Sequence, residues 1–102
     1  MEGAAHMRAL LIGIAHRNMI DIDSNVKALE ECVGGNIEKI ELKDGGVMIA
    51  NVQGMFKQYP RNDLASYICG KHVYGAVLIV GTDGDDFDDM PEQYLPLLGL
   101  EE

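Results

Sequence analysis

The feature that most constrains this fold is a nearly continuous apolar run of eight residues from Val73 to Val80, which reads Val-Tyr-Gly-Ala-Val-Leu-Ile-Val. A run of this length that is rich in β-branched side chains and ends at a glycine is typical of a strand buried on both faces. A chain of 102 residues has the size of one ordinary domain. We therefore predict a single domain with this strand at the centre of its sheet, ending at Gly81.

A β-hairpin is predicted in the middle of the chain. Two apolar segments, 37–42 and 47–52, flank the sequence Asp44-Gly45-Gly46. The Asp-Gly pair is a strong signal for a tight turn between two strands, because both residues tolerate the positive φ that such turns need.

Three shorter strands are also predicted. Residues 9–14 are mostly apolar, and residues 19–23 alternate polar residues with Ile20 and Ile22, which places the two isoleucines on one face. Residues 55–57 are expected to add a short strand before Tyr59-Pro60 interrupts regular structure.

Two helices are predicted in the first two thirds of the chain. The first runs from Asn25 to Val33, is capped by Asp23 or Ser24, and ends at Gly34-Gly35. A brief second helix follows Asn62 or Asp63 and ends at Gly70. The apolar side of the first helix is expected to consist of four residues: Val26, Leu29, Cys32 and Val33.

A third helix is predicted near the C-terminus. Asp89 and Glu92 have the spacing of a capping box, and Pro91 lies in the first turn. Pro96 lacks the amide that an interior turn needs, so the helix is expected to end or kink near Leu95. Four of its residues are expected to cover the core: Met90, Tyr94, Leu95 and Leu98.

These elements predict an α+β fold, a single small domain with a mostly antiparallel β-sheet packed by two to three short helices. Residues 1–6 are small and patternless, and we expect them to be an expression remnant outside the fold. The domain then comprises residues 7–102, with an acidic C-terminal helix segment. We expect a cytoplasmic protein, because no secretory signal and no bilayer-spanning run is present. Free buried cysteines are expected rather than a disulfide.

The charge of the chain is concentrated near its C-terminus. The formal net charge is -9, and residues 1–81 contribute only -1 of it. From Thr82 onward there are eight acidic residues and no Lys or Arg. This balance opposes direct binding to nucleic acid or to anionic membranes. The acidic segment is either a solvated face or a patch that meets a basic partner, and the partner-binding candidates are Asp83, Asp85, Asp86, Asp88, Asp89 and Glu92.

The alternative that the sequence allows is a small zinc-binding domain with a structural or redox-sensing metal site. Cys69 and His72 have a spacing that suits one metal ion, and His16 with Cys32 would complete a tetrahedral shell. The competing interpretation is that the cysteines are buried and the histidines lie on the surface. Cys69 with a histidine is also the single candidate pair for nucleophilic catalysis, but no nucleophile elbow surrounds it.

Other motif matches are incomplete. The Asp21-x-Asp23-x-Asn25 stretch resembles the start of a calcium loop, yet it lacks the glycine and the closing glutamate that such a loop needs. The Gly81-Thr82-Asp83-Gly84 turn lacks the Lys-Ser/Thr ending of a phosphate loop.

Several stretches together resemble a domain-of-unknown-function family of small acidic proteins from bacteria, phages, plasmids and conjugative elements. The resemblance extends from Met7 to about Leu98 and is carried by Val33-Gly34-Gly35-Asn36-Ile37-Glu38, Leu42-Lys43-Asp44-Gly45, Asn62-Asp63-Leu64-Ala65 and the segment 75–87. It implies no catalytic residues. It implies a non-catalytic protein of a phage or mobile element that binds and inhibits a host protein, such as a CRISPR or restriction nuclease. No cofactor is expected, and the oligomeric state is left open.

Overall fold

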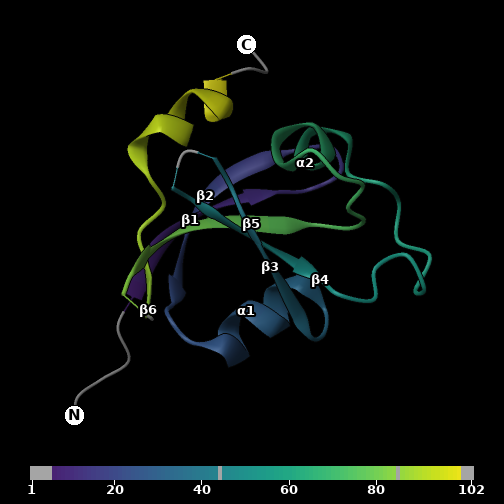
Figure 1. Cartoon of the computed structure of the whole chain (residues 1–102), viewed down its shortest axis with the longest axis horizontal. Helices are drawn as coiled ribbons and strands as arrows, with labels where there is room; N and C mark the ends of the chain where they lie inside the picture. Colours follow the sequence, from purple (N-terminus) through teal and green to yellow (C-terminus); the bar gives the residue numbers. More distant parts are fainter. Residues whose placement is uncertain (1–5, 44, 85, 100–102) are drawn as a thin grey trace.

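The structure of the chain, a computed structural model, describes residues 6–43, 45–84 and 86–99. Six strands and three short helices follow one another along these residues (Figure 1). They are β1 (His6–Ile12), β2 (Arg17–Asp23), α1 (Val26–Val33), β3 (Ile37–Glu41), β4 (Val47–Asn51), α2 (Asp63–Cys69), β5 (Val77–Asp83), β6 (Asp86–Asp88) and the 3-10 helix η1 (Glu92–Gly99). No helix in these ranges has the length and apolar character needed to cross a membrane.

The strands form one antiparallel sheet in the order β2-β1-β5-β4-β3, and β6 pairs with the far end of β5. Ile79 of β5 lies between Leu10 of β1 and Met48 of β4. The apolar run therefore supplies the central strand, and the predicted α+β fold with an antiparallel sheet is confirmed.

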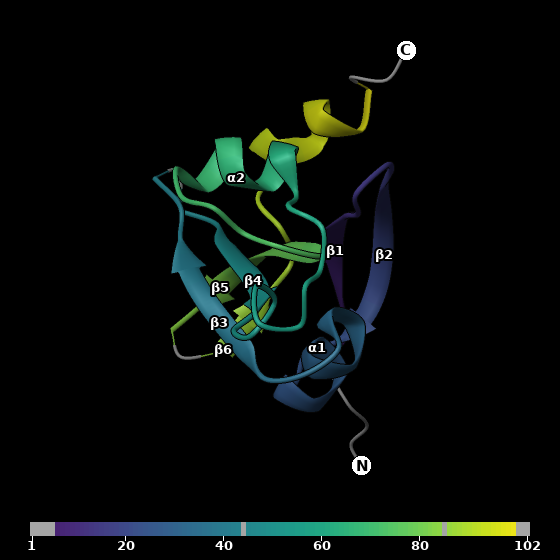
Figure 2. The ribbon, with the colours of Figure 1, turned by 90° about the vertical axis from the view of Figure 1, so that its right-hand side faces the viewer.

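Both faces of the sheet carry a buried cluster, and the side chains that alternate along each strand contribute to both clusters. On one face, Leu10, Met48 and Ile79 pack with residues of α2 and η1. On the other face, Ala9 and Ile49 pack with residues of α1. Figure 2 shows the sheet between α1 on one side and α2 with η1 on the other.

Helix α1 begins one residue later than predicted, and its cap differs. The side chain of Asn25 accepts a hydrogen bond from the amide of Ala28 at 2.9 Å, so Asn25 is the N-cap in place of Asp23 or Ser24. Gly34 ends the helix with a φ of +87°, as predicted. The apolar stripe is narrower than expected: Leu29 and Val33 are buried, whereas Val26 and Cys32 are exposed.

Asn62 anchors α2 to the sheet. Its side-chain oxygen accepts a hydrogen bond from the amide of Ala65 at 3.1 Å and thereby caps the helix. Its amide group donates to the carbonyl oxygens of Ile12 and Gly75, both at 2.9 Å. One side chain, 1% exposed, thus joins β1, α2 and the segment before β5.

The central strand starts later and ends later than predicted. Residues 73–76 are not part of β5, because Gly75 has a φ of +85° and the carbonyl of Val73 accepts from the amide of Asn62 at 2.9 Å. Tyr74 instead forms an isolated antiparallel bridge with Arg61, and Val73 is buried in the same cluster as Ala65 of α2. At its other end β5 continues past Gly81 to Asp83, because β6 pairs with it there.

Two other parts of the prediction differ from the structure. Residues 55–57 form no strand; they lie in a turn closed by bonds from Lys57 N to Gln53 O and from Gln58 N to Met55 O. His6 belongs to β1 and pairs with Asp23, so it is part of the fold, while residues 1–5 lie outside the described residues.

The C-terminal helix is a 3-10 helix that includes Pro96 instead of ending near Leu95. The fixed φ of proline lies within the range of a 3-10 helix, so the element tolerates it. Met90 and Tyr94 are buried as predicted, whereas Leu95 is 38% exposed. The side chain of Leu98 lies outside the described part of the chain.

Candidate interaction surface

The acidic segment forms a two-stranded hairpin at one end of the sheet (Figure 1). The last pair between β4 and β5 joins Val47 to Val80, and β5 then runs three residues further. β6 folds back on this extension, so that Thr82 pairs with Phe87 and Asp83 pairs with Asp86. We call residues 81–88 the acidic hairpin.

A glycine makes the return of the chain next to this hairpin possible. A Cβ atom at Gly81 would collide with the backbone carbonyl of Asp89. Because that atom belongs to the backbone, no side-chain rotation relieves the contact. Gly81 therefore allows the chain after β6 to pass close to β5 and to reach β1.

The acidic candidates divide into two groups by their hydrogen bonds. Asp89 accepts a bond from the Arg8 amide at 2.7 Å, and the next residue, Met90, donates its amide to the Arg8 carbonyl at 2.8 Å. Asp88 accepts from the amide of Asp89 at 2.8 Å. The Asp89 carboxylate thus helps to hold the chain against β1, whereas the Asp88 bond is local to its own segment; both residues are exposed.

Asp83, Asp86 and Glu92 are exposed as well. Asp83 and Asp86 occupy directly paired positions. Neither side chain forms a hydrogen bond or an ion pair with another described residue. Like charges opposite each other across two strands destabilise a sheet. Asp85 lies outside the described residues.

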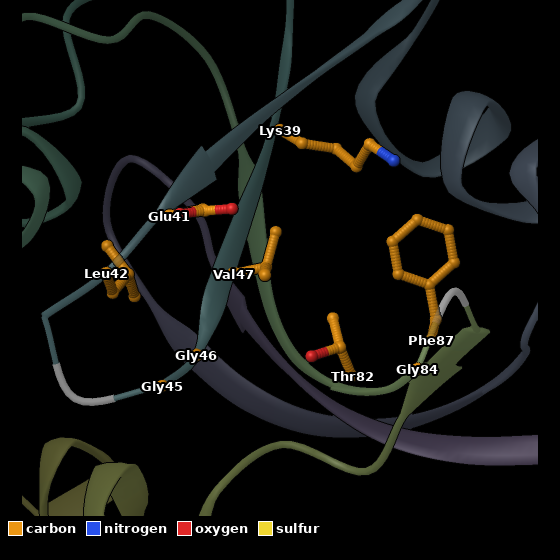
Figure 3. A pocket seen from close by; sticks show the side chains of 9 residues that line it. All are labelled: Lys39, Glu41, Leu42, Gly45, Gly46, Val47, Thr82, Gly84 and Phe87. Carbon is orange, nitrogen blue, oxygen red and sulfur yellow. The ribbon is translucent and has the colours of Figure 1, made fainter.

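A groove of about 730 Å³ lies between the acidic hairpin and the β3–β4 turn. Figure 3 shows Lys39 and Glu41 of β3 on one side of it, with Phe87 and Thr82 on the other. The ammonium group of Lys39 is 5.5 Å from the centre of the Phe87 ring, a favourable cation–π distance. The groove thus combines one cation, one carboxylate and an aromatic ring beside exposed carboxylates.

Sequence reasoning did not identify this groove. Lys39 and Phe87 are far apart in the chain, and only the topology of the sheet brings β3 and β6 to the same end. The one available signal was the alternation of Asp86, Phe87 and Asp88. In a strand, that pattern turns the aromatic ring inward, and Phe87 does pack partly against the core on the α1 face.

The structure does not bring the four predicted zinc ligands together. Cys32 lies on α1 and Cys69 on α2, which cover opposite faces of the sheet. His16 is exposed in the β1–β2 turn, and His72 is exposed just after α2. Within the described ranges, no three His, Cys, Asp or Glu side chains are placed to share a metal ion. Spacing in the sequence misled here because the two cysteines belong to different layers.

The environments of the two thiols also differ from the prediction of buried cysteines. Cys32 is an exposed free thiol and Cys69 is partly buried, with its Sγ 3.4 Å from the carbonyl oxygen of Lys71. Partial desolvation, assisted by the charge of Glu31, raises the pKa of the Cys32 thiol above its usual 9.0. This thiol is thus mostly protonated at neutral pH, the opposite of an activated nucleophile.

An ion pair stabilises the segment after α2. The ammonium of Lys71 donates to Glu38 of β3 at 2.8 Å. This hydrogen bond and the attraction to the carboxylate raise the pKa of Lys71 above its usual 10.5. The stability that corresponds to this raised pKa is complete below the usual Lys pKa and is lost as the pH rises above it.

The fold and the acidic hairpin define a small α+β domain with a charged end. The model of a family described as a domain of unknown function, DUF3846, matches residues 7–98, and the chain belongs to this family. No curated protein matches the chain in sequence.

A similar fold occurs in a crystal structure described as that of the small RNA methyltransferase HEN1. The TM-score is 0.65 at 15% sequence identity, and the match covers 87% of this chain and 15% of that chain. This chain therefore corresponds to a small part of that protein. At this level of identity, the likeness concerns the fold alone.

Proposed function

We propose that this chain is a non-catalytic interaction domain that binds a basic surface of a partner protein through its acidic hairpin. The observation that carries the proposal is the direct pairing of the exposed residues Asp83 and Asp86. Because paired like charges cost stability, the fold gains nothing from this arrangement. A Lys or Arg side chain of a partner would neutralise both carboxylates and remove that repulsion.

The groove beside the hairpin supports the same proposal. Protein interfaces commonly combine a central aromatic contact with a polar rim. Phe87 offers such a ring and Glu41 a carboxylate in the same groove, whereas the side chains of Asp83 and Asp86 alternate to the other face of the hairpin. One face of the ring already carries the Lys39 ammonium, 5.5 Å from the ring centre, so the attraction for a partner's cation comes from the carboxylates.

The class of partner follows from charge and from the resemblance to proteins of phages and mobile elements. Proteins that handle nucleic acids carry basic grooves for phosphate groups. The eight acidic residues from Thr82 onward match such a groove in sign. We therefore propose a host CRISPR or restriction nuclease in the cytoplasm as the partner, with the hairpin either occupying its nucleic-acid groove or docking at the rim.

The proposal is tested by DNA cleavage assays with a panel of purified CRISPR and restriction nucleases, with and without this protein. We expect inhibition of at least one nuclease. The double variant Asp83→Lys/Asp86→Lys is expected to raise the concentration needed for half inhibition by about tenfold or more, since it reverses the charge that guides docking.

The matched control is Glu30→Lys/Glu31→Lys, which makes the same change of charge on α1. This control is expected to inhibit nearly as well as the unaltered protein. Equal loss in both double variants would show that net charge matters and the hairpin does not. Absence of inhibition across the panel would contradict the assignment of a nuclease as the partner.

A further inference from the structure

The groove between β3 and the acidic hairpin is an exposed part of the sheet face on which α1 packs. Side chains alternate along a strand, so β3 directs Ile37, Lys39 and Glu41 to this face. Ile37 packs against the cluster that contains residues of α1, whereas Lys39 and Glu41 are exposed. Val47 of β4 pairs with Glu41 and is buried in the same cluster. Toward the hairpin, the apolar layer under α1 thus gives way to a polar hollow.

Side chains of different chemistry surround this hollow (Figure 3). β3 contributes the Lys39 ammonium and the Glu41 carboxylate, while the hairpin contributes the Thr82 hydroxyl and the Phe87 ring. The volume of about 730 Å³ lies within the range of about 300–1,000 Å³ that is usual for small-molecule sites. Such sites combine apolar surface with a few polar groups that fix the orientation of the ligand.

The two charges of the groove have no ionic partner in the part of the chain that the structure describes. Lys39 forms a cation–π contact with Phe87 and no ion pair, and the Glu41 side chain forms neither a hydrogen bond nor an ion pair. The two residues are only about 7 Å apart along one face of the strand. The Lys39 side chain nevertheless extends toward the hairpin and away from Glu41 (Figure 3). A cation and an anion are therefore both open to a ligand.

This pair of charges disfavours ligands with a charge of one sign. An anion would be attracted by Lys39 but repelled by Glu41 and by the net charge of -9. A cation would be attracted by Glu41 but repelled by Lys39. A molecule with one charge of each sign can form a charge-assisted hydrogen bond with both side chains. Because it has no net charge, the field of the acidic segment does not repel it.

We propose that the groove binds a small zwitterion whose ammonium and carboxylate groups are the free ends of an amino acid or a short peptide. The Glu41 carboxylate accepts hydrogen bonds from the ligand's ammonium group, and the Lys39 ammonium donates to the ligand's carboxylate. Val47 and Phe87 offer apolar contact to a ligand side chain. The Thr82 hydroxyl is available to a peptide group of the ligand.

The expected binding is modest in strength. Lys39 and Glu41 are exposed, so each ionic contact with the ligand competes with water. We expect dissociation constants in the submillimolar to millimolar range. Binding is measured on the chain alone, without a nuclease, so it succeeds or fails independently of the function proposed above.

The first test is titration calorimetry of the unaltered chain with leucine, alanyl-leucine and alanyl-alanyl-leucine. The three ligands share both free ends and one apolar side chain, and they differ in the distance between the ends. At least one is expected to bind, and the tightest binder shows whether an amino acid or a peptide is the source of the zwitterion. Failure of all three to bind at several millimolar would overturn the proposal.

The tightest binder is then compared with its N-acetyl derivative and its C-terminal amide, each of which lacks one of the two charges. Each blocked ligand is expected to bind about tenfold more weakly, because it loses one charge-assisted hydrogen bond. Equal affinity of the free and the blocked ligands would refute recognition of the two ends.

The second test assigns each end of the ligand to a side chain. Lys39→Met and Glu41→Gln each remove one charge with little change of shape, and each is expected to lower affinity about tenfold. In Lys39→Met, the free ligand and its C-terminal amide should bind equally, since the partner of the carboxylate is gone. Circular dichroism establishes that each variant is folded.

The matched controls are Lys27→Met and Glu31→Gln, which make the same changes of charge on α1. Both controls are expected to bind the ligand like the unaltered chain. Unchanged affinity in the two groove variants, or an equal loss in the controls, would overturn the assignment of the site to this groove.

Discussion

The side chain of Asn62 forms hydrogen bonds with backbone groups of three separate segments. Its partners are the amide of Ala65 and the carbonyl groups of Ile12 and Gly75. The sequence predicted one of these roles, the helix cap, because capping depends on residues close in the chain. The bonds to Ile12 and Gly75 depend on the fold, and no local pattern announces them.

Substitution of Asn62 by alanine is expected to lower the free energy of unfolding by about 3 kcal/mol, since it removes a helix cap and two buried hydrogen bonds to backbone carbonyl groups. Urea unfolding measures the change. Asn25→Ala, which removes the exposed cap of α1 alone, should cost only about 1 kcal/mol. A cost for Asn62→Ala no greater than that of Asn25→Ala would show that its bonds to the sheet contribute little.

The thiol of Cys32 provides a pH-dependent prediction. Because its pKa is raised, the thiolate fraction at neutral pH is smaller than that of free cysteine, and alkylation of a Cys69→Ser variant by iodoacetamide should be correspondingly slow. The rate should rise as the pH passes above 9.0. By linkage, any stability that Cys32 contributes is complete below that pH and declines above it. Alkylation at neutral pH faster than that of free cysteine would contradict this environment.

At the scale of elements, the carboxylates of the acidic hairpin and that of Asp89, the residue after it, have different tasks. Asp89 completes hydrogen bonding along β1, whereas Asp86 only adds charge opposite Asp83. Asp89→Asn keeps an acceptor oxygen and should leave stability nearly unchanged, while Asp89→Ala should lower it by about 1 kcal/mol.

Asp86→Ala is the comparison for that pair of variants. It is expected to leave stability unchanged or to raise it slightly, because it removes a like-charge contact. Thermal unfolding of the three variants measures the differences. If Asp86→Ala destabilises the chain as much as Asp89→Ala, the division between structural and partner-binding carboxylates is incorrect.

The elements that the sequence predicted well are those defined by local chemistry. The β3–β4 hairpin and the end of α1 depend on glycines at fixed places, and both were located within a few residues. The start of β5 was placed too early because Val73 is buried beside α2, and burial alone does not distinguish a strand from a packed loop. The continuation of β5 to Asp83 depends on β6, a strand that was not predicted.

At the scale of the whole molecule, the topology of the sheet determines which distant residues lie near one another, and the spacing of residues in the sequence does not. The zinc hypothesis used both cysteines and two histidines, but the sheet separates Cys32 from Cys69. The same topology assembles the groove, since β3 and the β5–β6 hairpin reach the same end of the sheet, where the Lys39 ammonium lies 5.5 Å from the centre of the Phe87 ring. The fold class followed from the order of elements, whereas the candidate site required the order of strands in the sheet.

The central claim is that the acidic hairpin is the docking element of this domain. The most direct measurement is the dissociation constant for an inhibited nuclease as a function of salt concentration, for the unaltered chain and for Asp83→Lys/Asp86→Lys. We predict that affinity falls steeply with salt for the unaltered chain, and that the double variant binds more weakly with a much flatter dependence. Equal affinities and equal slopes for the two proteins would contradict the claim.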